Sequence, residues 1–126
     1  MENIFGEKLV SCCTNPMTGY FRDGLCRADK SDVGTHVVCA VVTKEFLEFS
    51  FAMGNDLTTP RPQYQFQGLK PGDKWCLCAL RWKEAFEAGC APKVYLEATS
   101  EKALEFISMN DLIAHAYKKE DNLSSI

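Results

Sequence analysis

The fold of this 126-residue chain is decided by one stretch, VVCAVVTKEFLEFSFAMGN at residues 37–55. Val37–Val42 is apolar and rich in β-branched residues on both faces, which is typical of a central strand covered on both sides. Thr43 follows where a helix N-cap is expected, and residues 44–53 place apolar side chains at helical spacing before Gly54. The stretch therefore predicts a buried strand that leads directly into a helix.

The segments after this stretch predict two more strands, each followed by a helix. The predicted strands are 74–79 and Val94–Ala98, and the predicted helices are 80–88, a short helix at 100–107 capped by Thr99, and a last helix that begins after Ser108. The intervening segment 55–73 contains prolines, which exclude helix and central-strand pairing alike. It is expected to form a long ordered loop, and such loops often carry function.

Upstream of the central stretch, Asp23-Gly24 lies between two β-favouring segments, and this dipeptide is a strong signal for a hairpin turn. The expected fold class is therefore α+β: a single domain of residues 1–126, in which an N-terminal β-hairpin region precedes strand-helix repeats. Because tight strand-helix-strand connections favour right-handed crossovers, we expect a mixed, partly parallel sheet with helices packed on it. Residues 1–6 and 120–126 are expected to be frayed.

Charge and hydropathy exclude several classes of partner. The net charge is -3 at pH 7, and the lysines and arginines are interspersed with acidic residues, so no basic stripe exists for nucleic acid. The longest apolar run, Val37–Val42, is far too short to span a membrane, and the N-terminus lacks the features of a secretory signal. We therefore expect a cytoplasmic protein that binds neither nucleic acid nor membranes.

The chain contains seven cysteines, an odd number, and a cytoplasmic location would keep them reduced. A disulfide framework is therefore not expected. Buried free cysteine behaves as a small apolar residue, and we favour this role for most of the seven.

The alternative role for the cysteines is a metal site. Cys76 and Cys78 are two apart on a predicted strand, so their side chains leave the same face. Together with Cys26 they could hold zinc, which is bound by thiolate and imidazole ligands. The further ligands considered are Cys39, His36 and one of Cys12 and Cys13. His36 and Cys39 are three apart on a strand, so they are expected on opposite faces and not to act together.

Six polar residues are candidates for a small-molecule site, because their segments can gather at one end of the sheet. They are Arg22, Asp23, His36, Asn55, Asp56 and Arg61. Arginine offers a bidentate clamp for a carboxylate or phosphate, while histidine or aspartate can move a proton. Three of them also have structural interpretations: Asp23 in a turn, Asn55 as a helix stop, and Arg61 in hydrogen bonds to loop carbonyls.

A resemblance to a known family is carried by four segments in order: CTNPMTGYFRDGLC (13–26), DVGTHVVCAVVT (32–43), GNDLTTPRP (54–62) and GLKPGDKWCLC (68–78). In sequence and spacing they resemble a family of small, uncharacterised, mainly bacterial proteins that is classified as a domain of unknown function. The likeness spans nearly the whole chain. It implies no activity, ligand or catalytic residue, because none is established for the family.

Three hypotheses for function therefore stay open. The first is a small ligand-binding or interaction module, whose site lies where the predicted hairpin, His36 and the loop 55–62 approach one another. Its partner is a small molecule or a protein, and no cofactor is favoured. The second is a metal-binding or thiol-dependent enzyme that uses Cys26, Cys76 and Cys78, with zinc as the metal. The third is a purely structural role in an assembly, which needs an exposed apolar patch.

Overall fold

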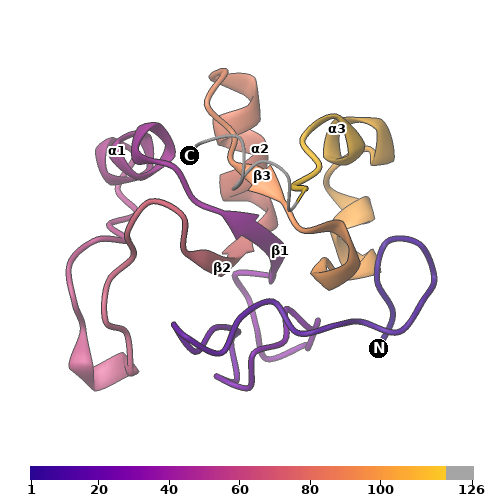
Figure 1. Ribbon diagram of the computed structural model, residues 1–126, viewed down its shortest axis with the longest axis horizontal. Helices are drawn as coiled ribbons and strands as arrows, with labels where there is room; N and C mark the ends of the chain where they lie inside the picture. The colour runs from indigo at the N-terminus through magenta and orange to yellow at the C-terminus, as the bar shows by residue number, and fades with distance from the viewer. Residues whose placement is uncertain (119–126) are drawn as a thin grey trace.

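The computed structural model describes residues 1–118, and within them the sheet has three strands (Figure 1). They are β1, His36–Val41; β2, Lys74–Cys78; and β3, Lys93–Val94, in the order β2-β1-β3. β1 is the central strand and its residues 37–40 are fully buried, as the apolar sequence predicts. The α+β class and the single domain are confirmed.

Both pairs of neighbouring strands are antiparallel, so the expected mixed, partly parallel sheet is wrong. Since β2 and β3 each run against β1, they run in the same direction as each other. The helix between them, α2 (Ala79–Glu87), therefore connects two parallel strands, but β1 lies between these strands in the sheet. The predicted strand-helix-strand order is thus present in β2, α2 and β3. Because β1 lies between β2 and β3 in the sheet, these two parallel strands do not pair with each other.

Three α-helices and three short 3-10 helices complete the described part of the chain. The α-helices are α1, Lys44–Ala52; α2, Ala79–Glu87; and α3, Met109–Ala114, and the 3-10 helices are η1, Pro62–Tyr64; η2, Leu96–Ala98; and η3, Glu101–Glu105. The predicted N-caps of α1 and α3 are confirmed. Thr43 Oγ1 accepts from the amide of Phe46 at 3.1 Å, and Ser108 Oγ accepts from the amide of Asp111 at 3.2 Å.

The third predicted strand, Val94–Ala98, is wrong beyond its first residue. The amide of Tyr95 still donates to Cys39 O at 2.8 Å, and the chain then turns into η2. Thr99 explains the change, because its hydroxyl donates to Tyr95 O at 3.0 Å and accepts from the amide of Cys39 at 3.1 Å. This side chain takes the place of a backbone partner that a longer β3 would supply. Ser100, and not Thr99, caps the 3-10 helix that follows.

The predicted hairpin at Asp23-Gly24 is also wrong, because residues 1–35 contain isolated bridges and no strand. Gly24 donates its amide to Thr18 O at 2.9 Å, and its carbonyl accepts from the amide of Cys12 at 2.7 Å. These bonds fold residues 12–25, which we call the N-terminal loop, into a compact irregular turn. The amides that flank the expected turn are also paired locally, that of Arg22 with Gly19 O at 3.0 Å and that of Leu25 with Asp23 Oδ1 at 3.1 Å, so they are not available to a hairpin ladder.

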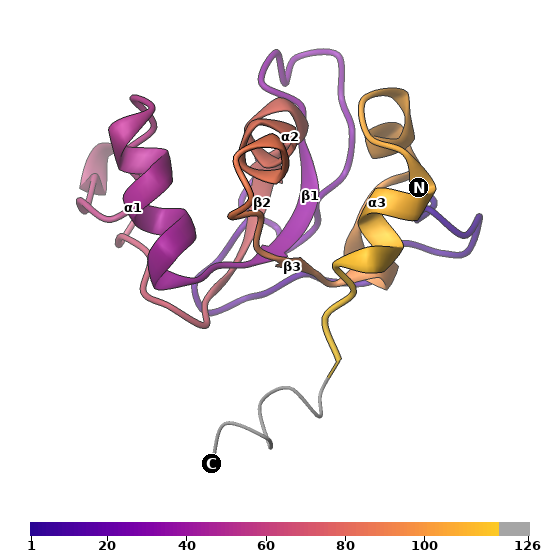
Figure 2. The ribbon, with the colours of Figure 1, turned by 90° about the horizontal axis from the view of Figure 1, so that it is seen from above.

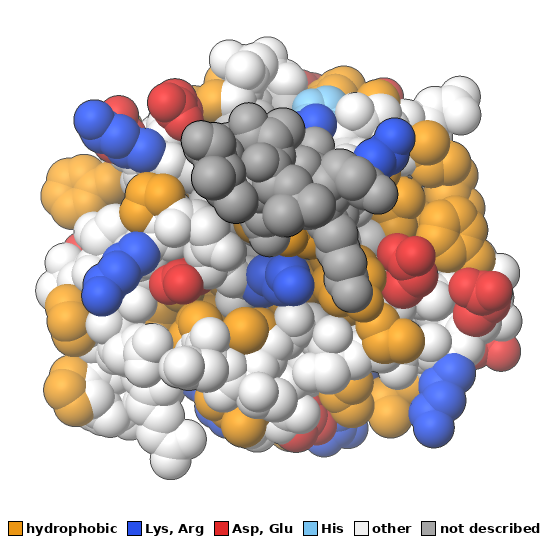
Figure 3. Space-filling view, in the orientation of Figure 1, with side chains coloured by type: hydrophobic (Ala, Val, Ile, Leu, Met, Phe, Trp, Pro, Cys, Tyr) orange, Lys and Arg blue, Asp and Glu red, His pale blue; other side chains and the backbone are white. Residues whose placement is uncertain are grey.

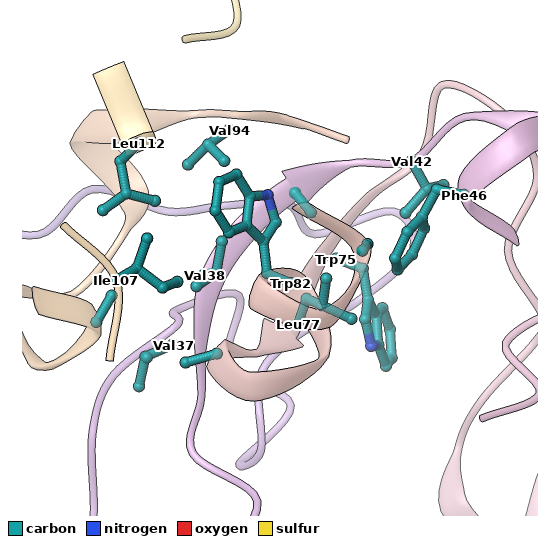
Figure 4. Packing of buried hydrophobic residues seen from close by; sticks show 14 of the residues in the cluster. Val37, Val38, Val42, Phe46, Trp75, Leu77, Trp82, Val94, Ile107 and Leu112 are labelled. Carbon is teal, nitrogen blue, oxygen red and sulfur yellow. The ribbon is translucent and has the colours of Figure 1, made fainter. Parts of the chain in front are cut away.

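The two faces of the sheet are covered by different parts of the chain (Figures 1 and 2). In Figure 1 the helices lie above the sheet and most of the N-terminal segment lies below it. The main core is on the helix side, where Figure 4 shows Trp82 of α2 beside Val38 of β1. Trp82 is fully buried, and its indole N–H donates to Pro92 O at 3.1 Å. On the opposite side, four cysteines form a second, smaller cluster.

The N-terminal residues 1–6, which are expected to fray, include Asn3 and Ile4, and both of these are buried. The amide of Ile4 donates to Thr99 O at 3.1 Å, and Asn3 Nδ2 donates to Glu97 O at 3.1 Å. These bonds tie the start of the chain to its C-terminal half. The expected fraying at 120–126 lies outside the described residues.

The surface carries charges of both signs. On the face drawn in Figure 3, acidic and basic side chains are interspersed among apolar ones, without a basic stripe. No helix within residues 1–118 is long and apolar enough to cross a membrane.

Candidate functional site

A pocket of about 480 Å³ opens where the N-terminal loop, the start of β1 and the long loop 55–73 meet. Its size is within the range of small-molecule sites. The lining residues come from four segments: Gly19, Tyr20 and Arg22; His36; Asn55, Asp56, Leu57, Arg61, Tyr64 and Phe66; and Trp75 and Cys76. The pocket therefore exists only because segments distant in sequence are packed together.

Five of the six polar candidates line this pocket: Arg22, His36, Asn55, Asp56 and Arg61. Asp23 is not among the lining residues. Its carboxylate accepts from the amide of Leu25 at 3.1 Å and pairs with Arg27 Nε at 2.8 Å. Asp23 thus has the structural role in a turn that its residue type favours.

Arg22 joins the N-terminal loop to the long loop and is held in one orientation. Its Nη1 donates to Gly19 O at 2.6 Å, and its Nη2 donates to Tyr64 O at 3.1 Å. The guanidinium lies 5.0 Å from the centre of the Trp75 ring, within cation–π distance. Burial lowers the pKa of Arg22, and Nε is buried without a hydrogen-bond partner among the described residues. The charge of Arg22 is therefore close to the pocket and unmatched by a carboxylate within residues 1–118.

His36 is oriented by a buried aspartate. Its Nδ1 lies 2.6 Å from Asp32 Oδ1, and its amide donates to Asp32 Oδ2 at 2.8 Å. The Asp32 side chain is 1% exposed and that of His36 is 39% exposed. Gly34 makes room for the ring, because a Cβ at this position would collide with His36 Cε1. Since a carboxylate accepts, Nδ1 is the donor of this pair and Nε2 is left for a ligand.

The long loop contributes a carboxylate and a guanidinium to the rim. Hydrogen bonds from Thr59 and Thr58 hold the pKa of Asp56 well below its usual value, so Asp56 is ionised at neutral pH. Asp56 Oδ2 lies 3.7 Å from Arg61 Nη2, a long distance for an ion pair. The Arg61 side chain is 46% exposed, so it keeps donors that can turn toward the pocket. Asn55 ends α1 through its amide, which donates to Ser50 O at 2.8 Å.

The cysteines contradict the expectation that disulfides are absent. Cys12 is bonded to Cys39 and Cys26 to Cys76, so the two pairs alternate along the chain. Cys39 and Cys76 lie opposite each other on β1 and β2. The N-terminal segment crosses this face and brings their partners to them, a contact that cysteine spacing does not encode. The remaining cysteines are free and half-buried: Cys13, Cys78 and Cys90.

A β-bulge changes which side chains share a face of β1. The register pairs His36 with Cys78 and Cys39 with Cys76, with a shift between His36 and Val38. Cys76 and Cys78 are two apart on β2, so their side chains share a face of the sheet. Their partners on β1, Cys39 and His36, therefore share that face too, although the bulge places them three apart in sequence. The expectation that His36 and Cys39 point to opposite faces is therefore wrong.

The zinc ligands expected from the sequence come together only in part. Cys26 and Cys76 are bonded to each other, whereas Cys78 is a free thiol. Cys78 lines a smaller cavity of about 210 Å³ that borders the main pocket. The two cavities share His36, Asn55, Leu57 and Trp75 as lining residues.

Sequence reasoning missed the aromatic walls of the pocket and the partner of His36. Tyr20 and Tyr64 are exposed at the rim, while Phe66 and Trp75 are buried at the floor in edge contact at 5.0 Å. Aromatic residues of this kind look like core in a sequence, so they carry no separate signal. The sequence does contain one sign of this partner, because Asp32 is an acidic residue four positions before His36.

Comparison with known families places these features in context. The family model DUF2237, described as an uncharacterised protein conserved in bacteria, matches residues 2–116. This range includes every residue that lines the pocket and all seven cysteines. No curated protein matches the chain. Because the family model covers most of its length, the chain belongs to the DUF2237 family of uncharacterised proteins conserved in bacteria.

Proposed function

We propose that this chain binds a small anionic molecule, one that carries a carboxylate or phosphate group, in the 480 Å³ pocket. The lining contains two arginines and a histidine against one aspartate. Since Asp32 pairs with His36, the site holds two guanidinium groups and two carboxylates, and the proposal rests on the donors of the two arginines and not on a net positive charge. Arginine is the side chain best suited to bind a carboxylate or phosphate.

The fixed guanidinium of Arg22 is the observation that carries the proposal. Each Nη has two N–H groups and gives one to a backbone carbonyl, so a second remains on each for a ligand oxygen. The backbone of Arg22 has φ 56°, a left-handed conformation that is uncommon for a residue other than glycine. Such outliers concentrate at ligand sites, where the surrounding structure enforces them.

The other side chains of the pocket support the same class of ligand. Arg61 is only loosely paired with Asp56, so its guanidinium can turn to a second oxygen of the anion. His36 offers Nε2 as a further donor or acceptor. The buried floor of Leu57, Phe66 and Trp75 suits the carbon skeleton of the molecule.

A ligand panel tests the proposal. It contains inorganic phosphate, small phosphate esters, and mono- and dicarboxylates, each added to the full chain in a thermal-shift assay. A ligand at one hundred times its Kd adds about 2.7 kcal/mol to the unfolding free energy. For a domain of this size that raises Tm by roughly 10 °C. We expect at least one anion to give such a shift and its neutral analogue to give none.

Two matched variants assign the binding to the pocket. Arg61→Gln removes a half-exposed rim charge and should weaken binding roughly tenfold or more, because a hydrogen bond to a charged group contributes about 1.5–3 kcal/mol. Arg27→Gln removes the same charge from a pair with Asp23 outside the pocket and should leave Kd unchanged. Equal losses in the two variants would contradict the proposal, as would a panel in which no anion binds.

A further inference from the structure

The four cysteines on the N-terminal side of the sheet bring their sulfur atoms to one buried point. Their exposed fractions are 4% for Cys12, 0% for Cys26, 0% for Cys39 and 2% for Cys76. The Sγ atoms of Cys12, Cys26 and Cys39 all lie within 4.8 Å of one another, and Cys76 Sγ is bonded to that of Cys26. Three sulfurs thus form one close group, and the bond to Cys26 keeps the fourth sulfur, that of Cys76, beside this group.

This separation is close to that of a tetrahedral thiolate site. A Zn–S distance of about 2.3 Å places the four sulfurs of such a site roughly 3.8 Å apart. Three sulfurs here already lie within 4.8 Å of one another. Once the disulfides open, each bonded pair needs to separate by about 2 Å, and the sulfur of Cys76 needs to move in toward the other three. Two of the ligands, Cys39 and Cys76, lie opposite each other on paired strands, so half of the site is fixed by the sheet.

We propose that the reduced chain binds one zinc ion through the thiolates of Cys12, Cys26, Cys39 and Cys76. This site shares Cys26 and Cys76 with the zinc ligands expected from the sequence, and Cys12 and Cys39 complete it in place of Cys78. The inference goes beyond anion binding, since Cys12, Cys26 and Cys39 do not line the 480 Å³ pocket and Cys76 is the ligand that the two sites share. Four protein ligands close the coordination sphere, so the ion is structural.

The two states of the cluster are related by a balanced reaction. A dithiol reductant gives two electrons and two protons to each disulfide and is itself oxidised to a disulfide, so two reductant molecules produce four thiols. Zinc then displaces the four thiol protons and stays Zn²⁺. A compartment rich in thiols, such as the cytosol predicted from the sequence, favours the reduced state. In either state the N-terminal segment is fastened to β1 and β2 at the same point.

Metal titration of the full-length reduced chain is the first test. The protein is reduced, freed of metal with a chelator, and titrated without oxygen with Co²⁺ and then with Zn²⁺. We expect one ion per chain, the strong visible absorption of tetrahedral Co²⁺ with thiolate ligands, and its loss when Zn²⁺ is added. A titration without thiolate absorption overturns the proposal.

Alkylation of the same wild-type protein identifies the ligands without any substitution. With zinc bound, mass spectrometry should find Cys12, Cys26, Cys39 and Cys76 protected and the other three cysteines modified; a chelator should expose all seven. Protection of Cys78 or Cys13 in place of any of the four overturns the assignment. This readout stays decisive even when a ligand variant fails to fold.

Substitutions give the matched comparison. Cys39→Ser should lower zinc affinity by more than the roughly 10–100-fold that loss of an outer hydrogen-bond partner costs. Cys78→Ser changes the cysteine across from His36 on the neighbouring strand and should keep one ion per chain at unchanged affinity. Full zinc binding by Cys39→Ser, or its loss in Cys78→Ser, contradicts the site. Neither result bears on Arg61→Gln, so failure here is distinguishable from failure of anion binding.

Discussion

Removal of either disulfide from the oxidised protein should destabilise the fold by an amount set by the length of chain that the bond closes. The perturbation is a pair of double variants, Cys12→Ala with Cys39→Ala, and Cys26→Ala with Cys76→Ala. The bonded residues are 27 and 50 positions apart in sequence. The loop-closure entropy of these lengths corresponds to about 3.6 and about 4.1 kcal/mol at 25 °C. Because natural domains are stable by only about 5–15 kcal/mol, each loss is a large share of the total.

Equilibrium unfolding in urea measures these losses. The midpoint should fall in both variants, further in the variant that lacks Cys26–Cys76. The m-value should rise in both, since an unfolded chain with one cross-link fewer exposes more surface. The control is Cys78→Ala with Cys90→Ala, which removes two unbonded thiols and should cost about 1 kcal/mol or less. Losses in the disulfide variants no larger than in this control would refute the reasoning.

Three further predictions concern single side chains. Asp32→Asn should lower the free energy of unfolding by about 2 kcal/mol, because the buried carboxylate accepts from both the amide and the ring of His36; a denaturation curve within about 0.5 kcal/mol of wild type would speak against these bonds. The pKa of Asp56 is lower in the folded protein than its usual value, so the stability it contributes is present above that usual value and is lost as the pH falls below it. Asp56→Asn should therefore flatten the acid side of a plot of Tm against pH, and an unchanged acid side would count against the Thr58 and Thr59 hydrogen bonds. Burial raises the pKa of the Cys90 thiol, so at pH 8 Cys90 should be alkylated more slowly than free glutathione, and a faster reaction would be inconsistent with its burial.

The parts of the fold that the sequence predicts are those with local causes. The start of α1 follows from Thr43, whose hydroxyl caps an amide three residues away. The central position of β1 follows from an apolar run that only a strand covered on both sides can bury. In each case the residues that determine the structure are neighbours in sequence.

The parts that the sequence does not predict depend on contacts between distant residues. β3 ends where it does because the hydroxyl of Thr99 accepts a hydrogen bond from the amide of Cys39, which is sixty positions away in the sequence. The failed hairpin and the disulfides have one cause, since the N-terminal segment is shaped by the face of the sheet that it covers. Cysteine count and spacing contain no information about that docking.

The candidate site contains features of both kinds, some with local causes in the sequence and some that depend on contacts between distant residues. Arg22, His36 and Arg61 line one pocket, and the sequence indicates this proximity because they lie in a turn, at a strand start and in a long loop, where polar side chains can meet at a sheet end. The bulge after His36 could not be foreseen, since its cause is the pairing with β2. The aromatic floor was hidden because Phe66 and Trp75 resemble ordinary core residues.

The alternating order of the two disulfides has a consequence for proteolysis. Cys12 is bonded to Cys39 and Cys26 to Cys76, so a single backbone cut at any point between Cys12 and Cys76 leaves the two fragments joined by at least one bridge. A trypsin cut after the exposed Lys30, for example, leaves one cysteine of each disulfide on either fragment. The cleaved protein should therefore migrate as one band until a reductant is added. In its oxidised form the segment between Cys12 and Cys76, about half of the chain, can thus be cleaved once without separation of the two fragments.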